Sequence, residues 1–410
     1  MPFLVGELRI LRRTCDRRRI PFLGSARIAV VSIVLLVSLL VAATAVWWGV
    51  QPQPHSTAPV VYAYTTAHTV VVVRDGRTVA QRTGDFGIGA AQPQWTADGQ
   101  WLFFLLHPAS TLPGDTSAAV PQPRLVTIHP STGTVRDLAC PACASVGAVR
   151  ADVVLAAQHD GTSEDRRLRL LHFDLASGQA PIQFTTTLPA ELSSFRFLTA
   201  TAGTAVAAGT DPSLVSAYGG PERLFVMDGT GAARPVPFLG GDMAFSSATG
   251  VRESVDRSGI VALVGGTHAG ACEWGNSVEL LDTRSGTVTM TDLSAAVPPQ
   301  ANTARDSGLA VSDLWWNGDG TLHATISAWR CDHRLPDPHV AVIRPSLWHL
   351  DGSRWRSDGP APAGMTRPLG SGRQLQLAPP PSDGSGSTLV LQTPEHTSTV
   401  ATHVQGISVP

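Results

Sequence analysis

The chain has 410 residues, of which 43% are hydrophobic and only 15% are charged, and its formal net charge is −2. This composition supplies enough apolar material for a large core, and the near-neutral charge argues against a nucleic-acid binder. All 30 basic residues are Arg, which excludes mechanisms that need a lysine amine, such as Schiff-base chemistry or a phosphate-loop lysine.

The chain opens with an Arg-rich tail, residues 1–27, followed by an uncharged apolar stretch at residues 28–50. About 20 apolar residues are enough to cross a bilayer as a helix. Trp47 and Trp48 stand where an interfacial aromatic belt would lie, and the Arg cluster flanks one side only. We therefore expect a single transmembrane helix at 28–50 in the cell membrane, with residues 1–27 in the cytoplasm and the rest of the chain outside.

The alternative for this stretch is a cleaved signal peptide, with "ATA" at 43–45 as the cleavage site. Signal-peptide apolar regions are typically shorter, about 7–15 residues, so the uncleaved anchor is favoured. Residues 51–59, "QPQPHSTAP", then form a Pro-rich polar linker without a core of its own.

From residue 60 to 410 the pattern is all-β: short runs rich in β-branched residues alternate with Gly, Asp, Ser and Pro. One unit recurs, a strand, a tight turn with Asp or Ser-Gly, and a second strand. An Asp side chain can cap such a turn, and Gly supplies its positive φ. The copies include "VVVVRDGRTVAQ" (70–81), "LVTIHPSTGTVRDL" (125–138), "LLHFDLASGQAPIQF" (170–184), "LFVMDGTGAARPVPF" (224–238), "VELLDTRSGTVTMTDL" (278–293) and "LWHLDGSRWRSDG" (347–359).

A second motif lies upstream of these hairpins, clearest in "WTADGQWLFFLL" from residue 95 and "WWNGDGTLHATIS" from residue 315. Together the two motifs give four strands in about 50 residues, which is the pattern of a β-propeller blade. We expect the Trp or Phe of the motif to pack between blades. The repeats predict seven blades, with six as the alternative, and the first blade is completed by strands from residues 388–410.

The segment "TADGQWLFFLL…PRLVTIHPSTGTVRDL" resembles the repeat of TolB-like, WD-repeat-like propeller proteins. The resemblance covers about residues 60–410 and is sharp in three or four blades. The chain is similar to membrane-anchored propellers of actinobacterial type. The resemblance implies a scaffold or binding protein more often than an enzyme.

No motif for hydrolase, metalloprotease, P-loop or dinucleotide chemistry is present, and the 13 His residues are scattered. The sequence therefore predicts no catalytic residues, no cofactor and no metal. Cys140 and Cys143 in "CPAC" lack the second pair that a zinc site needs, so we expect a local disulfide in an oxidising compartment.

The longest expected loops, among them 266–276 and 328–345, lie on one face of the propeller, where binding usually resides. Cys272 and Cys331 occupy equivalent loops of consecutive blades and are predicted to form the second disulfide. These two loops also carry the candidate binding residues, which are rich in the types found at binding hot spots: Glu273, Trp274, Trp329, Arg330, Asp332, His333 and Arg334. The alternative is that the Trp side chains only cover the blade edge while the charges pair with each other.

The sequence thus favours a membrane-anchored, extracytoplasmic propeller that binds a protein or a cell-envelope component. An envelope hydrolase or lactonase with its site at the propeller centre, and a structural subunit of an export or cell-wall complex, are the alternatives. The sequence predicts no nucleic-acid partner, and it leaves the oligomeric state open.

Overall fold

The computed structural model describes residues 59–84, 86, 92–107, 122–160, 167–201, 203–210, 222–236, 244–249, 259–268, 274–296, 307–332, 334–335, 339–379 and 386–410. They all belong to one compact unit, Pro59–Pro410. The predicted tail and transmembrane helix lie outside the described residues. Within those residues, no helix has the length and apolar character needed to cross a bilayer.

The described unit is built of β-strands, with a single short 3-10 turn, η2 (Ser294–Ala296). The strands are β1 (Val61–Thr66), β2 (Thr69–Arg74), β3 (Arg77–Thr83), β4 (Gln94–Trp95), β5 (Leu102–Leu106), β6 (Arg124–His129), β7 (Thr134–Ala139), β8 (Cys143–Arg150), β9 (Val153–Asp160), β10 (Arg167–Asp174), β11 (Ile182–Phe184), β12 (Ser193–Thr201), β13 (Thr204–Thr210), β14 (Glu222–Asp228), β15 (Ala233–Pro235), β16 (Ala244–Thr249), β17 (Ile260–His268), β18 (Trp274–Asp282), β19 (Val288–Met290), β20 (Ser307–Trp316), β21 (Leu322–Cys331), β22 (His339–Asp351), β23 (Arg354–Pro360), β24 (Met365–Gly370), β25 (Arg373–Leu377), β26 (Ser387–Gln392) and β27 (Thr397–Ser408).

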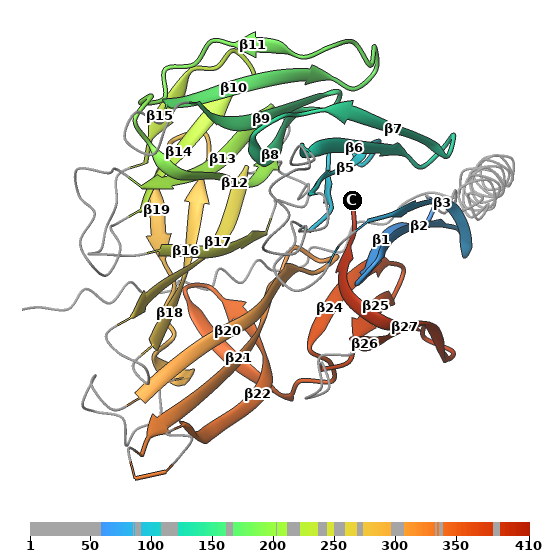
Figure 1. Ribbon diagram of the computed structural model, residues 1–410. Helices are drawn as coiled ribbons and strands as arrows, with labels where there is room; N and C mark the ends of the chain where they lie inside the picture. The colour runs from blue at the N-terminus through green and yellow to red at the C-terminus, as the bar shows by residue number, and fades with distance from the viewer. Residues whose placement is uncertain are drawn as a thin grey trace, which may run out of the picture. The chain divides into compact units, whose positions relative to one another are not determined.

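These strands form antiparallel units of four consecutive neighbours: β4–β7, β8–β11, β12–β15, β16–β19, β20–β23 and β24–β27 (Figure 1). Successive four-stranded meanders are the arrangement of propeller blades. The fold is therefore an all-β propeller, as the sequence predicts.

The two ends of the unit meet in one sheet. β27, red in Figure 1, lies between β26 and β1 and pairs with both, so that β1–β3 extend the β24–β27 sheet. Its register with β1 runs from Ala63↔Ser408 to Thr66↔Val404. The C-terminal segment therefore pairs with the first strand of the unit, as expected.

The hairpin turns have the backbone conformation and the hydrogen bonds that their Gly and Asp residues favour. All six hairpin glycines have positive φ: Gly76, Gly133, Gly178, Gly231, Gly286 and Gly352. In the β10–β11 turn, Asp174 Oδ1 accepts hydrogen bonds from the backbone N–H groups of Ala176 and Ser177, each at 2.9 Å. These bonds hold the pKa of the Asp174 carboxyl below its usual value.

The same turns also connect one unit to the next. Arg136 of β7 donates to the carbonyl of Leu175, at 2.7 Å, in the neighbouring turn. Arg234 of β15 likewise donates to the carbonyls of Thr283 and Arg284, both at 3.1 Å. Carbonyl groups of a turn that accept no hydrogen bond within the turn therefore accept one from an Arg of the preceding unit.

Apolar cores lie between units rather than within them. Six clusters of buried side chains each join two neighbouring groups of strands: β1–β3 with β4–β7, β4–β7 with β8–β11, β8–β11 with β12–β15, β12–β15 with β16–β19, β16–β19 with β20–β23, and β24–β27 with β1–β3. Alternate residues of a strand face opposite sides of its sheet, so each sheet can contribute to two cores.

The contact between β20–β23 and β24–β27 contains a buried carboxylate. Asp313 of β20 accepts the backbone N–H of Thr366 at 2.8 Å through Oδ2 and Nη1 of Arg367 at 2.7 Å through Oδ1. The Asp313 side chain is only 2% exposed.

Candidate functional site

The predicted binding residues fall on or beside the hairpin of β21 and β22. Trp329 and Arg330 lie near the end of β21, and Asp332 and Arg334 follow in the turn. Only the backbone of Trp274, the first residue of β18, is described. Three further candidates, Cys272, Glu273 and His333, lie outside the described residues.

The backbone brings the two predicted segments together. Gly275 of β18 pairs in parallel with Leu309 of β20, and Leu309 pairs with Ala328 of β21. The side-chain amide of Asn276 reinforces this junction, because its oxygen accepts the N–H of Val311 at 2.8 Å. The start of β18 and the end of β21 thus lie two strand spacings apart, about 10 Å.

The expectation of long loops at 266–276 and 328–345 is wrong for most of their length. β17 continues to His268 and β18 begins at Trp274, while β21 continues to Cys331 and β22 begins at His339. The sequence did not predict these longer strands, because the apolar and polar residues of the segments do not alternate strictly. β21 and β22 make register shifts at Ile326/Ala328 and Ala328/Trp329, and such bulges break the two-residue period.

We call residues 328–332, 334–335 and 339–344 the arm. β23 pairs with β22 only from Ser346 onward, so the arm extends beyond the fourth strand of its unit. It carries Leu335, which is 47% exposed, and Val342, which is 40% exposed, two of the five large exposed apolar side chains among the described residues. Three arginines of the arm are also exposed: Arg330, Arg334 and Arg344.

Trp329 has a packing role in the arm. Its indole lies so close to the backbone of Gly308 that a Cβ atom at that position would come within 2.1 Å of the ring, and it meets the His339 ring edge-on at 5.4 Å. Only a glycine leaves room for this ring on β20. Trp329 is nevertheless only partly buried, so part of the indole is available at the surface.

Asp332 shapes the turn of the arm. Its Oδ1 accepts the backbone N–H of Arg334 at 3.1 Å, and its carbonyl accepts the N–H of Leu335 at 3.0 Å. An Asp that holds a turn in this way fixes the direction of the side chains that follow it. Leu335 and Arg334 are therefore presented from an ordered turn.

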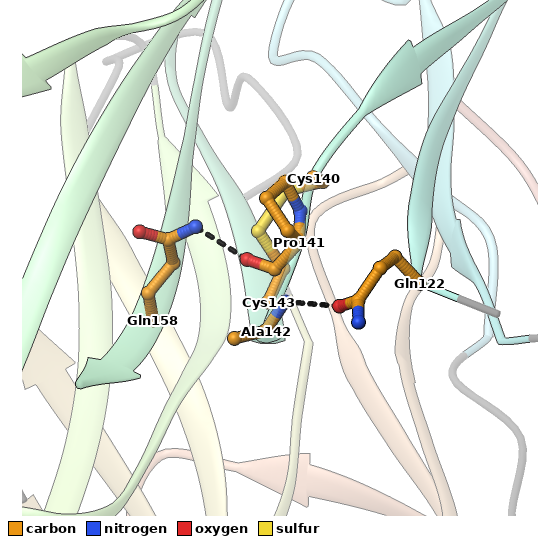
Figure 2. The surroundings of a disulfide bond; sticks show 6 residues. All are labelled: Gln122, Cys140, Pro141, Ala142, Cys143 and Gln158. Atoms are coloured by element: carbon orange, nitrogen blue, oxygen red, sulfur yellow. Dashed lines mark hydrogen bonds between the residues drawn. A yellow bond between two sulfur atoms is a disulfide. The ribbon is translucent and has the colours of Figure 1, made fainter. Parts of the chain in front are cut away.

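The predicted local disulfide is present: Cys140 and Cys143 are bonded, with Cα atoms 5.5 Å apart. Figure 2 shows Gln158 donating to the Pro141 carbonyl and Gln122 accepting the N–H of Ala142. Cys140 is fully buried and Cys143 is 2% exposed, within the core shared by β4–β7 and β8–β11. Burial shields this bond from thiolate attack and gives it a structural role.

Cys331 is also disulfide-bonded, and its partner is not among the described residues. Cys272 lies outside them as well, three positions before Gly275. The pairing of Cys272 with Cys331 therefore stays a prediction.

The sequence reading missed a cluster on the same sheet. His349 Nδ1 lies 2.7 Å from Asp358 Oδ1, and His323 Nδ1 lies 3.8 Å from Asp358 Oδ2. A register shift between β22 and β23 leaves Asp358 as an extra residue opposite Leu347 and Trp348, and its side chain reaches His349. Scattered positions in three strands gave no sequence signal for this grouping.

His323 is the most buried member of the cluster and stacks on Trp315, with ring centroids 5.7 Å apart. Burial lowers the pKa of the His323 imidazole, an effect that the Asp358 and Asp319 carboxylates oppose and His349 reinforces. Among the described residues, no group of three or more His, Cys, Asp or Glu side chains has the arrangement needed to hold a metal ion.

Comparison with known proteins finds no matching family model and no matching curated protein. Similar solved structures include the β-propeller domain of the trilobed protease from Pyrococcus furiosus, at 12% identity over 82% of this chain and 87% of that chain, with a TM-score of 0.44. TolB from Acinetobacter baumannii is 15% identical over 76% of this chain and 69% of its own, with a TM-score of 0.36.

An acylaminoacyl peptidase from Pyrococcus horikoshii is 12% identical over 84% of this chain, with a TM-score of 0.46. The match covers only 52% of that peptidase. The assignment as a propeller rests on the strand order of this chain.

Proposed function

We propose that the protein is a membrane-anchored, extracytoplasmic propeller that binds a protein or a cell-envelope component through the arm. The observation that carries this proposal is the arm itself: exposed Leu335 and Val342 beside three exposed arginines, on a hairpin that extends past its own sheet. Exposed apolar side chains next to Arg are typical of interaction surfaces.

The anchor and the location are supported by the sequence alone. The uncharged stretch at 28–50 is long enough to span a bilayer, and the Arg residues of 1–27 would remain in the cytoplasm. The bonded Cys140–Cys143 pair agrees with an oxidising compartment for the propeller.

We further propose seven blades. Six are the four-stranded units from β4–β7 to β24–β27, and the seventh combines β1–β3 with the last part of β27, which pairs with β1. Electron-microscopy class averages of the propeller should then show seven blades, and six would overturn the assignment.

The second disulfide is proposed to join Cys272 and Cys331. Cys331 is bonded, and Cys140 and Cys143 bond each other. Cys272 lies two positions before the start of β18, which lies near the end of β21. Non-reducing peptide mapping should recover the two segments as one linked fragment. Recovery of Cys331 linked to Cys15, or of Cys272 as a free thiol, would refute the pairing.

The binding proposal is tested by affinity purification of the full chain from membranes. Leu335→Asp together with Val342→Asp should remove the specific partners, because both changes place a charge in the apolar part of the arm. Ile182→Asp on β11 is the matched control, since Ile182 is also exposed, at 63%, and belongs to another unit. Equal thermal stability of the variants is checked first. An unchanged set of partners would exclude the arm as the binding surface.

A further inference from the structure

We propose that the junction between β20–β23 and β24–β27 is a gate that opens locally while the apolar junctions of the propeller stay closed. Among the described residues, the hydrogen bonds found across this junction go to one carboxylate, that of Asp313, from the backbone N–H of Thr366 and the guanidinium of Arg367. Both donors come from adjacent residues of β24, so a small movement of that strand breaks both bonds together.

The chemistry of the junction favours opening in water. When an ion pair and its hydrogen bonds separate into solvent, each group regains hydration, which offsets most of the lost attraction. An apolar junction gains nothing comparable when it opens, because its side chains lose burial without a new partner. The Arg367 side chain is 21% exposed in the closed junction, so one partner of the pair already contacts water.

The face of β20–β23 that carries Asp313 continues as a row of aromatic and titratable side chains. Trp315 lies two residues along β20 and therefore on the same face, and it pairs with His323, which pairs with His349. Opening would hydrate this row of aromatic and titratable side chains. The opposite face of the same sheet belongs to the apolar core shared with β16–β19.

β24 belongs to a well-anchored sheet, because it pairs with β25 and its Met365 and Leu369 pack against the core shared with β1–β3. β27 pairs with β1, and Leu375, Leu389 and Val404 pack with Tyr62 and Val71 in the core shared with β1–β3. The gate therefore lies between two well-anchored sheets, and β24 is the strand of the second sheet that faces it.

The test is amide hydrogen exchange of the full chain in detergent micelles, followed by mass spectrometry at increasing urea concentrations below the unfolding transition. Peptides of β24 that contain Thr366 should exchange at least about 10-fold faster than peptides of β26, through an opening that urea barely affects, because local openings expose little surface. Exchange of β24 with the same strong urea dependence as β26 would overturn the gate.

Two variants sharpen the test. Arg367→Met removes the ion pair and should accelerate exchange of β24 further, while β5 and β26 keep their rates. Arg136→Met removes a polar bond at an apolar junction and should leave β24 unchanged. Equal acceleration of β24 by both variants would show general destabilisation and refute the gate. If Arg367→Met does not fold, the urea dependence of the wild-type protein still decides.

Discussion

Two junctions of the propeller show how differently neighbouring sheets can be joined. Between β4–β7 and β8–β11, the side chains of Phe103, Leu125 and Phe173 are fully buried together, and the Cys140–Cys143 disulfide lies in the same core. Between β20–β23 and β24–β27, Asp313 meets Thr366 and Arg367.

The difference teaches that one repeated backbone arrangement accepts two kinds of joint. The apolar joint gains about 25 cal/mol for each Å² of apolar surface removed from water, whatever the exact geometry. The polar joint depends on geometry, because a buried carboxylate is tolerated only while its hydrogen-bond donors stay in place. Substitutions at the two joints should therefore have different consequences.

The largest effect is expected at the apolar joint. Phe103→Ala deletes a fully buried ring and leaves a cavity between two sheets, and should lower the free energy of unfolding by about 4 kcal/mol. Urea unfolding monitored by tryptophan fluorescence measures the change. A loss below about 1 kcal/mol would mean that this junction is not a close-packed core.

At the polar joint, Asp313→Ala should cost about 3 kcal/mol, because the buried N–H of Thr366 and the Arg367 guanidinium both lose their acceptor. The double variant Asp313→Leu with Arg367→Leu should recover the part of this loss that comes from the unpaired guanidinium, while the N–H of Thr366 still lacks an acceptor. Urea unfolding of both proteins compares the two joints directly. A double variant as unstable as the single one would show that the pair cannot be replaced by packing.

The disulfide at the apolar joint contributes less to the free energy of unfolding than the buried side chains do. Replacing Cys140 and Cys143 together by Ser should cost roughly 2 kcal/mol, because the bond closes only a very short loop and the entropy it removes from the unfolded chain is small. The thermal unfolding midpoint of the double variant is compared with that of Phe103→Ala. A larger decrease for the double variant would show that the disulfide contributes more to stability than the buried ring.

Much of the fold could be predicted from the sequence because its signals are local. Each hairpin turn carries a Gly, preceded in five of the six turns by a nearby Asp, and all six predicted glycines have positive φ. The pairing of the C-terminal strand with β1 followed from counting four strands per unit. The lengths of β21 and β22 could not be predicted, because bulges break the alternation on which strand prediction depends.

The polar joint and the histidine cluster could not be predicted either. Asp313 and Arg367 are 54 positions apart in the chain and belong to no repeated motif. Asp358 meets His349 only because a register shift brings it to that position. Such contacts depend on how two sheets are placed, which no local pattern encodes, whereas the exposed residues of the arm stood out by their Trp and Arg content.

The smallest expected effect is on the pH dependence of stability, and it arises on the face of β20–β23 that forms the polar joint. The pKa of His323, on the Asp313 face, is lowered from 6.5 because burial disfavours the imidazolium. Below pH 6.5 the unfolded chain then binds more protons than the folded chain, so this residue makes stability fall as the pH drops from about 6.5 toward the lowered pKa. His323→Gln should flatten the profile in this range, whereas His396→Gln, in the exposed β26–β27 turn, serves as the control. Urea unfolding at pH 7.5, 6.5 and 5.5 provides the measurement. Parallel profiles for wild type and His323→Gln would show that His323 takes up its proton equally well in the folded and unfolded chain.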